Sequence, residues 1–349
     1  MTASTADRPW LGSYSPGVPA DIDVAQYSSL VHLMEESFGK YASRPAYSFM
    51  GKQITFAQTD SLSLAFAAYL QGLGLVKGDR VAIMMPNVPQ YPVAVAGILR
   101  AGFVVVNVNP LYTARELEHQ LKDSGAKAIV IIENFAHTLQ SCLAHTPVKH
   151  VVLASMGDRL GFLKGAVVNY VVRNVKKMVP AYSLPKAISW KKVMSLGAGS
   201  SYKREEMTLK DAAYLQYTGG TTGVSKGAEL THGNICANMQ QISEWMKPKL
   251  KEREEVVITA LPLYHIFALT VNCLAMMKIG AHNVLITNPR DMPGFIKELS
   301  KVKFTVITGV NTLFNGLMNA EGFANLDFST LKVAVGGTAS PLDAMALEG

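Results

Sequence analysis

Residues 80–132 read RVAIMMPNVPQYPVAVAGILRAGFVVVNVNPLYTARELEHQLKDSGAKAIVII. Apolar, mostly β-branched runs alternate here with stretches of helical periodicity. The runs predict strands at 80–85, 103–107 and 128–132, and the intervening stretches predict helices at 89–100 and 113–122. Near-continuous apolar strands separated by helices are typical of a parallel sheet that is covered on both faces. The stretch therefore predicts an α/β fold.

The helix predicted at 113–122 has a clear start signal. Thr113 is followed three residues later by Glu116, the spacing of a capping box in which each side chain bonds the other residue's backbone N–H. This pair fixes where the helix begins.

The same alternation continues beyond residue 204. Strands are predicted at 213–217, 256–260, 283–287, 304–308 and 331–335, and helices at 231–246, at 265–276 and from near Pro293 and Asn311. We therefore expect two layered α/β subdomains. The expected organisation is an N-terminal arm at 1–26, a first subdomain at 27–158, a basic connector at 159–204 and a second subdomain at 205–349.

The net charge of +7 comes from the connector alone. Residues 159–204 contain ten Lys or Arg and no Asp or Glu, whereas the remainder carries 23 basic and 26 acidic residues. Nucleic-acid binding is not expected, because aromatic residues are sparse there and no recognition motif accompanies the charge. Within the connector, 165–179 interleaves apolar residues with Arg173, Lys176 and Lys177. This pattern predicts a helix on an anionic membrane surface; the alternative is a solvated connector whose apolar face packs on its own domain.

Other features favour a cytoplasmic protein, with peripheral contact to the inner face of the cytoplasmic membrane. Residues 1–22 lack the apolar region of a signal peptide. Cys142, Cys236 and Cys273 are widely spaced and fit neither a disulfide framework nor a metal site. The longest uncharged stretch, 256–277, predicts a strand, a turn and a helix rather than a membrane span. The oligomeric state is left open, with a homodimer as one alternative.

The strongest local signal is YTGGTTGVSKGA at 217–228, between a predicted strand and the helix predicted from 231. Its glycines and threonines let backbone N–H groups and hydroxyls converge on an anion, and Lys226 adds a full positive charge. The glycine spacing excludes a Walker A loop, and Gly227 stands where that motif has Ser or Thr. The dinucleotide pattern GxGxxG is also absent. We therefore predict a phosphate-binding loop.

Residues 217–226 resemble the signature of the adenylate-forming superfamily, which contains acyl-CoA synthetases, luciferases and the adenylation domains of peptide synthetases. Gly219 stands where the superfamily commonly has Ser or Thr, and this departure resembles the fatty-acid branch. Ser225 stands where Pro is common. From about residue 27 to residue 337 the chain is similar to bacterial long-chain fatty-acid–CoA ligases. The stretches that carry this similarity are 80–87, 107–120, 261–267, 287–291 and 308–314.

The resemblance implies a reaction in two steps. ATP and a medium- or long-chain fatty acid give an acyl-adenylate and pyrophosphate, and the thiol of CoA then displaces AMP to form a thioester. Charge builds on the phosphates in the first transition state, so catalysis would be mainly positioning and electrostatic stabilisation. The implied co-substrates are ATP and CoA, and the implied metal ion is Mg²⁺.

The resemblance also assigns roles to single residues. Thr218 would help to hold Mg²⁺, together with a glutamate of a later motif. His265 would border the acyl pocket and the carboxylate without acting as a general base; the alternative is a buried, hydrogen-bonded core histidine. The implied nucleotide-binding residues are Tyr217, Thr218, Gly219, Gly220, Thr221, Thr222, Gly223 and Lys226. The implied acyl-site residues are His265, Val310, Asn311, Phe314, Gly336 and Gly337, with ordinary packing as the alternative for Val310, Asn311 and Phe314.

The family pattern continues beyond residue 349 with the magnesium-binding glutamate, a ribose-binding aspartate and a small domain that carries a lysine. Residues 338–349 depart from that pattern. We therefore expect the 349-residue chain to be inactive or severely impaired as a ligase by itself. Two other functions stay open: a ligase for aryl or short acids, and a non-catalytic module that binds nucleotide, fatty acid or membrane.

Overall fold

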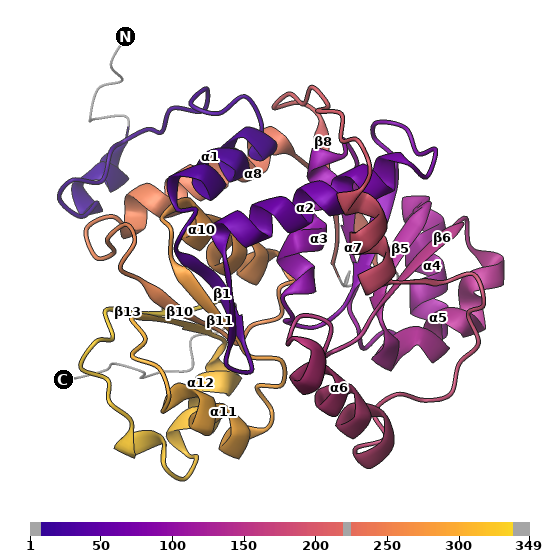
Figure 1. Ribbon diagram of the computed structural model, residues 1–349. Helices are drawn as coiled ribbons and strands as arrows, with labels where there is room; N and C mark the ends of the chain where they lie inside the picture. The colour runs from indigo at the N-terminus through magenta and orange to yellow at the C-terminus, as the bar shows by residue number, and fades with distance from the viewer. Residues whose placement is uncertain (1–7, 219–224, 338–349) are drawn as a thin grey trace.

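The computed structural model describes residues 8–218 and 225–337. Within these residues the chain forms two sheets, with helices between them and on their outer faces (Figure 1). The six-stranded sheet has the order β13 (Val333–Gly336), β12 (Val306–Gly309), β10 (Val256–Thr259), β11 (His282–Leu285), β1 (Pro45–Phe49) and β2 (Lys52–Thr55). The seven-stranded sheet has the order β7 (Ile188–Ser189), β6 (His150–Ala154), β5 (Ala128–Ile132), β3 (Arg80–Met84), β4 (Val104–Asn107), β8 (Ala212–Thr218) and β9 (Lys226–Thr231). This arrangement confirms the predicted fold class.

All neighbouring strands in the two sheets are parallel except the pairs β1–β2 and β8–β9. The α-helices of the described residues are α1 (Leu30–Lys40), α2 (Phe56–Gln71), α3 (Gln90–Arg100), α4 (Ala114–Ser124), α5 (Ala136–Cys142), α6 (Phe162–Tyr170), α7 (Trp190–Ala198), α8 (His232–Met246), α9 (Ile266–Ala268), α10 (Met276–Lys278), α11 (Met292–Leu299) and α12 (Asn311–Met318). Two segments are π-helical, η5 (Val171–Val175) and η6 (Leu269–Ala275). The short 3₁₀ turns are η2 (Pro9–Ser13), η3 (Glu133–Phe135), η4 (Leu143–His145) and η7 (Phe323–Asn325).

Apolar side chains fill the space on both faces of each sheet. The largest cluster lies between the sheets and includes residues of α1, α2 and α3, such as Leu33, Phe66 and Val95. A second cluster packs α4 and α5 on the outer face of the seven-stranded sheet, and a third packs α11 and α12 on the outer face of the six-stranded sheet. Burial on both faces explains why the parallel strands are apolar at nearly every position.

The predicted elements at 80–132 are confirmed to within two residues at each end, and α4 begins with the predicted capping box of Thr113 and Glu116. The uncharged stretch 256–277 forms β10, a loop and the start of a helix that runs through α9 and η6, also as predicted. Among the residues that the structure describes, no helix has both the length and the apolar composition that crossing a membrane requires.

Strand β9 corrects the sequence analysis, which placed Lys226, Gly227 and Ala228 in a loop. These residues pair antiparallel with β8, so that Lys226 lies opposite Thr218 and Gly227 lies opposite Tyr217. A Cβ atom on Gly227 would lie 2.9 Å from the ring of Tyr217, so the pairing needs glycine there. Four of the six residues of β9 are exposed, and the strand therefore lacks the apolar alternation by which strands are detected.

Each sheet contains strands from both sides of the connector. The strands β1 and β2 extend the six-stranded sheet beside β11, and β8 and β9 extend the seven-stranded sheet beside β4. As a result Asn107, the last residue of β4, lies opposite Gln216 of β8. This exchange places the ends of strands from distant parts of the sequence side by side.

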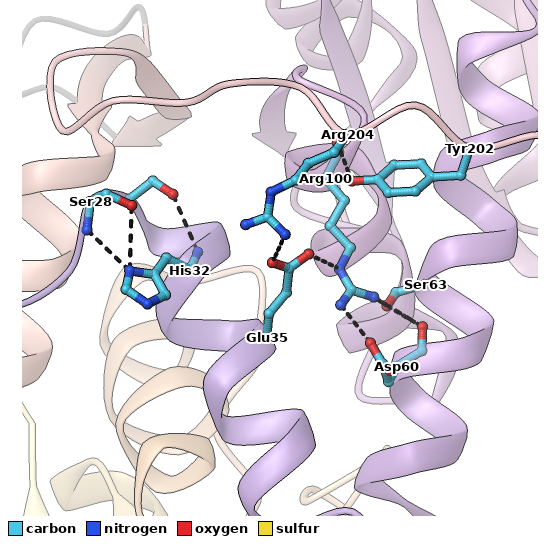
Figure 2. Close-up of polar contacts among 9 residues, drawn as sticks. Ser28, His32, Glu35, Asp60, Ser63, Arg100, Tyr202 and Arg204 are labelled. Atoms are coloured by element: carbon cyan, nitrogen blue, oxygen red, sulfur yellow. Dashed lines mark hydrogen bonds and ion pairs between the residues drawn. The ribbon is translucent and has the colours of Figure 1, made fainter.

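The end of the connector is fixed to the helices between the sheets by a buried arginine (Figure 2). Arg100 is only 3% exposed, and its guanidinium contacts Asp60 Oδ1 at 2.5 Å and Glu35 Oε1 at 3.4 Å. Glu35 also pairs with Arg204 of the connector at 2.6 Å, and the Tyr202 hydroxyl donates to the carbonyl of Arg100. The Arg100 cation therefore joins α1, α2 and α3, and residues 202–204 attach to this group through Glu35 and the Arg100 carbonyl.

Replacing Arg100 with methionine is expected to lower the free energy of unfolding by about 2–3 kcal/mol, because two partly buried carboxylates lose their common partner. Chemical denaturation measures the change. The control is Lys301→Met, which removes an exposed ion pair with Glu298 and should change stability by less than about 1 kcal/mol. Equal effects of the two substitutions would contradict a special role for Arg100.

The start of α8 is joined to the start of α1 by His232. This side chain is fully buried, and its Nδ1 accepts a hydrogen bond from the backbone N–H of Leu30 at 3.1 Å. Burial lowers the pKa of His232 to about 4. The folded protein therefore favours the neutral imidazole, which is the form that can accept this bond.

The low pKa predicts that the protein loses stability on mild acidification. Between about pH 6.5 and about pH 4 the unfolded chain protonates His232 and the folded chain does not, so the free energy of unfolding falls as pH falls. In His232→Asn the amide oxygen keeps an acceptor near Nδ1 without a titrating group, and the pH dependence of the denaturation midpoint should become weaker. Gln240→Asn serves as the control, since it changes a buried residue of α8 that has no titrating group and should leave the slope of the wild type.

Candidate functional site

A cavity of about 400 Å³ opens at the carboxyl ends of β4 and β8, beside the loop that follows β10. In open α/β sheets this edge of the strands is where ligands bind. The described residues that line it are Asn107, Asn109, Tyr112, Gln216, Tyr217, Thr218, Tyr264, His265 and Ile266. Three residues predicted from sequence, Tyr217, Thr218 and His265, therefore meet in one cavity.

Tyr217 and Thr218 form the end of β8 and differ in what they offer to a ligand. The hydroxyl of Tyr217 donates to Asp123 Oδ2 of α4 at 2.5 Å, and burial together with this carboxylate raises the pKa of the phenol. Its ring is thus a fixed wall of the cavity, and its hydroxyl is engaged elsewhere. The side chain of Thr218 is exposed at the cavity.

Lys226 lies beside the cavity without lining it. It is the first residue of β9, it is exposed, and the antiparallel register places it opposite Thr218. The carbonyl of Ser225, just before it, lies 3.2 Å from His119 Nε2 of α4. The two ends of the predicted phosphate-binding loop are therefore held together as neighbouring strands. The predicted ligands Gly219, Gly220, Thr221, Thr222 and Gly223 lie outside the described residues.

His265 is exposed to the cavity and is not a buried core residue. It caps the start of α9, where its Nδ1 accepts from the backbone N–H of Phe267 at 3.4 Å. With Nδ1 as acceptor, the neutral imidazole carries its proton on Nε2. The side chain can therefore donate one hydrogen bond to a ligand group.

The loop before His265 is held by a buried asparagine, which the sequence analysis did not single out for a role. Asn87, three residues beyond β3, is 3% exposed. Its Nδ2 lies 2.9 Å from the carbonyl oxygens of Thr259 and Leu261 and 3.2 Å from that of Ile286, and its Oδ1 accepts from the N–H of Leu263 at 2.8 Å. A side chain from the seven-stranded sheet thereby satisfies the strand ends of the six-stranded sheet.

A second set of hydrogen bonds reaches the cavity wall from the helix between the sheets. The Tyr91 hydroxyl lies 2.7 Å from both Asn107 Oδ1 and the carbonyl oxygen of Leu263. Asn107 Nδ2 donates to Gln216 Oε1 at 3.1 Å, and Gln216 Nε2 donates to the carbonyl of Tyr264 at 3.0 Å. The residue before His265 is therefore tied to both β4 and β8.

Asn87→Leu keeps the approximate shape of the side chain and removes all the hydrogen bonds that the Asn87 amide makes. The expected loss is about 3 kcal/mol or more in the free energy of unfolding, because several buried backbone groups lose their partners at once. Denaturant titration measures it. Asn319→Leu is the control, since Asn319 bonds only within its own exposed helix end and should change stability by less than about 0.5 kcal/mol.

The other predicted acyl-site residues lie at the carboxyl ends of β12 and β13 and do not line this cavity. Val310 and Asn311 begin α12, and the ring of Phe314 packs over Gly309. Gly336 ends β13, and a Cβ on the next residue, Gly337, would lie 3.0 Å from the ring of Phe267. Phe267, two positions after His265 in the chain, thus lies against Gly337.

The charge of the cavity suits an anion. None of its described lining residues is Asp or Glu, and Lys226 lies opposite Thr218. Burial raises the pKa of the Tyr264 phenol, and the positive charge of Arg290 opposes this rise. Within residues 8–218 and 225–337 no group of three His, Cys, Asp or Glu could hold a metal ion. The Thr218 hydroxyl is an oxygen donor of the kind that Mg²⁺ accepts when phosphates and water supply its other ligands.

Six lining residues were not assigned roles from sequence: Asn107, Asn109, Tyr112, Gln216, Tyr264 and Ile266. Asn107 and Gln216 carried a usable signal, because each is a polar residue at the carboxyl end of an apolar strand. Asn87 carried little, since an asparagine after a strand also suits an ordinary turn. Its importance depends on three chain segments that only the fold brings together.

Comparison with known proteins gives a consistent result. The AMP-binding enzyme family matches residues 34–347. A curated long-chain-fatty-acid–CoA ligase of Escherichia coli is 57% identical over 329 residues, covering 94% of this chain and 59% of that protein. The corresponding ligase of Yersinia pestis is 56% identical over 332 residues, covering 95% and 59%. The chain thus spans about three fifths of the length of these relatives.

Solved structures share the fold at lower identity. An anthranilate CoA ligase in complex with anthranoyl-AMP superposes with a TM-score of 0.75 at 19% identity, covering 90% of this chain and 56% of that chain. A long-chain-fatty-acid-CoA ligase of Archaeoglobus fulgidus superposes with a TM-score of 0.72 at 23% identity, covering 94% and 61%. These similarities concern the two-sheet architecture described above.

Proposed function

Because this chain belongs to the AMP-binding enzyme family, we propose that its protein activates medium- and long-chain fatty acids with ATP, first as acyl-adenylates and then as CoA thioesters. The observation that carries the proposal is the 57% identity to a long-chain-fatty-acid–CoA ligase over nearly the whole chain. The proposal concerns the whole protein, since the chain spans 59% of that relative.

In the first step an ionised fatty-acid carboxylate attacks the α-phosphorus of ATP, and pyrophosphate leaves. In this proposal Thr218, Gly219, Gly220, Thr221 and Thr222 hold the β- and γ-phosphates and Lys226 assists, while Tyr217 and Gly223 belong to the wider nucleotide site. The hydroxyl and the ammonium group stabilise charge that grows on the leaving pyrophosphate. Two observations support these roles. The described lining of the cavity has no carboxylates, and the register of β8 and β9 sets Lys226 opposite Thr218.

His265 is proposed to orient the fatty-acid carboxylate. Its Nε2–H donates toward the cavity while Nδ1 is held by the backbone of Phe267. No general base is needed, because the carboxylate is already ionised near neutral pH. Beyond His265 the acyl chain would pass Phe267 toward Val310, Asn311, Gly336 and Gly337, which lie at the ends of β12 and β13.

Mg²⁺ is proposed to accompany the phosphates of ATP. Thr218 would contribute one hydroxyl oxygen to its coordination shell, and the ion would neutralise part of the phosphate charge. None of the described residues that line the cavity offers a carboxylate, which suits a metal that arrives on its nucleotide.

The location of the reaction is also part of the proposal. Cys142, Cys236 and Cys273 are buried and free, as suits a reducing cytoplasm. The basic connector 159–204 would bring the protein to the anionic inner face of the cytoplasmic membrane, where fatty acids partition.

The direct test is acid-dependent ATP–pyrophosphate exchange, measured with palmitate, detergent and Mg²⁺ on a protein extended to the length of its relatives. Exchange that requires palmitate is the expected result. A preference for benzoate would replace the long-chain assignment with an aryl-acid ligase. Absence of exchange with every acid, in a folded protein that still binds ATP, would instead favour a non-catalytic nucleotide-binding module.

The phosphate contacts can be tested separately on the 349-residue chain. Thr218→Val keeps the shape of the side chain, Lys226→Ala removes the charge, and each is expected to raise the Kd for ATP about tenfold, which corresponds to about 1.4 kcal/mol. Titration calorimetry measures the change. Lys52→Ala, an exposed residue of β2, is the matched control. An unaltered Kd in both site variants would remove Thr218 and Lys226 from the phosphate site.

A further inference from the structure

The helix formed by α6 and η5 exposes apolar side chains where a surface helix normally exposes polar ones. Its inner side is buried: Gly157 N donates to Asn169 Oδ1 at 2.7 Å, and the backbone at Gly165 approaches Gly157 so closely that a Cβ would lie 2.4 Å from its carbonyl oxygen. The outer side carries Phe162, Leu163, Val167 and Tyr170, which are 87%, 77%, 61% and 63% exposed. Together these four residues form what we call the apolar ridge.

A loop from the other sheet lies against this helix. The β1–β2 hairpin turns at Met50, whose carbonyl oxygen accepts a hydrogen bond from Lys164 Nζ. Met50 is 44% exposed and adds a flexible apolar side chain next to the apolar ridge. Figure 1 shows α6 at the lower edge of the molecule, beside the tip of this hairpin. The exposed apolar surface therefore comes from two separate parts of the chain.

The charged residues of the segment that forms the apolar ridge are all positive. Lys164 lies within α6, and Lys176 and Lys177 follow η5, where the backbone at Lys177 has a φ of 50° and turns the chain. Residues 159–204 contain no Asp or Glu. Arg173 differs from these three lysines, because its guanidinium contacts the buried carboxylate of Glu133 at 2.8 Å and so anchors the helix.

We propose that the apolar ridge docks on an anionic lipid bilayer, with its side chains among the headgroups and Lys164, Lys176 and Lys177 on the lipid phosphates. Apolar and aromatic side chains flanked by cations match the boundary between acyl chains and anionic headgroups. The inference rests on the proposed function for its reason to be at a membrane, since it deepens the contact proposed for 159–204. It differs from the sequence-based prediction in its residues: Arg173 serves the fold, whereas Phe162 and Leu163 carry the insertion.

The test is sedimentation of the 349-residue chain with vesicles of phosphatidylcholine and phosphatidylglycerol, and with vesicles of phosphatidylcholine alone. The wild type should bind the anionic vesicles preferentially. Phe162→Ser/Leu163→Ser should lower the partition coefficient about tenfold or more, because two apolar side chains no longer leave water. Lys176→Gln/Lys177→Gln should lower the partition coefficient about tenfold, because electrostatic attraction to the anionic lipids is lost. High salt screens this attraction, so at high salt the wild type and this double variant should bind equally.

The control is Val24→Ser/Val76→Ser, which changes two exposed apolar residues outside the helix and should leave vesicle binding intact. Unchanged binding of Phe162→Ser/Leu163→Ser would overturn the proposal. A second result would also overturn it: the wild type does not bind vesicles but forms a dimer by light scattering, and Phe162→Ser/Leu163→Ser is a monomer. Palmitate-dependent exchange in detergent needs no vesicles, so loss of the membrane contact and loss of the proposed function give different results.

Discussion

The hydrogen bonds of Asn87 are the constraint on which the rest of the site depends. At the ends of β10 and β11, where the two sheets meet, the carbonyl of Thr259 accepts from the N–H of Ile286, and further backbone groups need partners from outside the sheet. One amide side chain from beyond β3 satisfies them. The loop that carries His265 therefore has a fixed starting point, and the two sheets have a fixed relation to each other at the cavity.

Much of the local structure could be predicted from sequence because most elements have a recognisable pattern within a few residues. The strands β3, β4 and β5 are continuous apolar runs, and α4 begins with a capping box that the structure contains. The strand β9 could not be detected in this way, since its backbone pairing rather than a buried face defines it. Nor could the partners of β1 and β8 be predicted, because strand order depends on contacts between distant residues.

The residues of the candidate site could also be predicted only in part. Tyr217, Thr218 and His265 were identified from motifs, and the structure brings them to one cavity. The side chains that hold this cavity in shape, Asn87 and Tyr91 in particular, lie in another part of the sequence and look like ordinary turn and helix residues. Motifs reveal the groups that face a ligand, whereas the groups that support them become visible only through three-dimensional contacts.

The exchange of strands between the sheets also governs the order in which the chain can fold. The pairs among β3, β4 and β5 all lie within residues 80–132, so this unit can form while the rest of the protein is still being synthesised. Tyr47 of β1 can pair with Asn283 of β11 only after β11 has been synthesised. Such distant parallel pairing is slow, because much chain entropy is lost before any contact forms. During synthesis the β1–β2 hairpin therefore presents an open strand edge until β11 is available, and an unpaired edge of this kind favours aggregation.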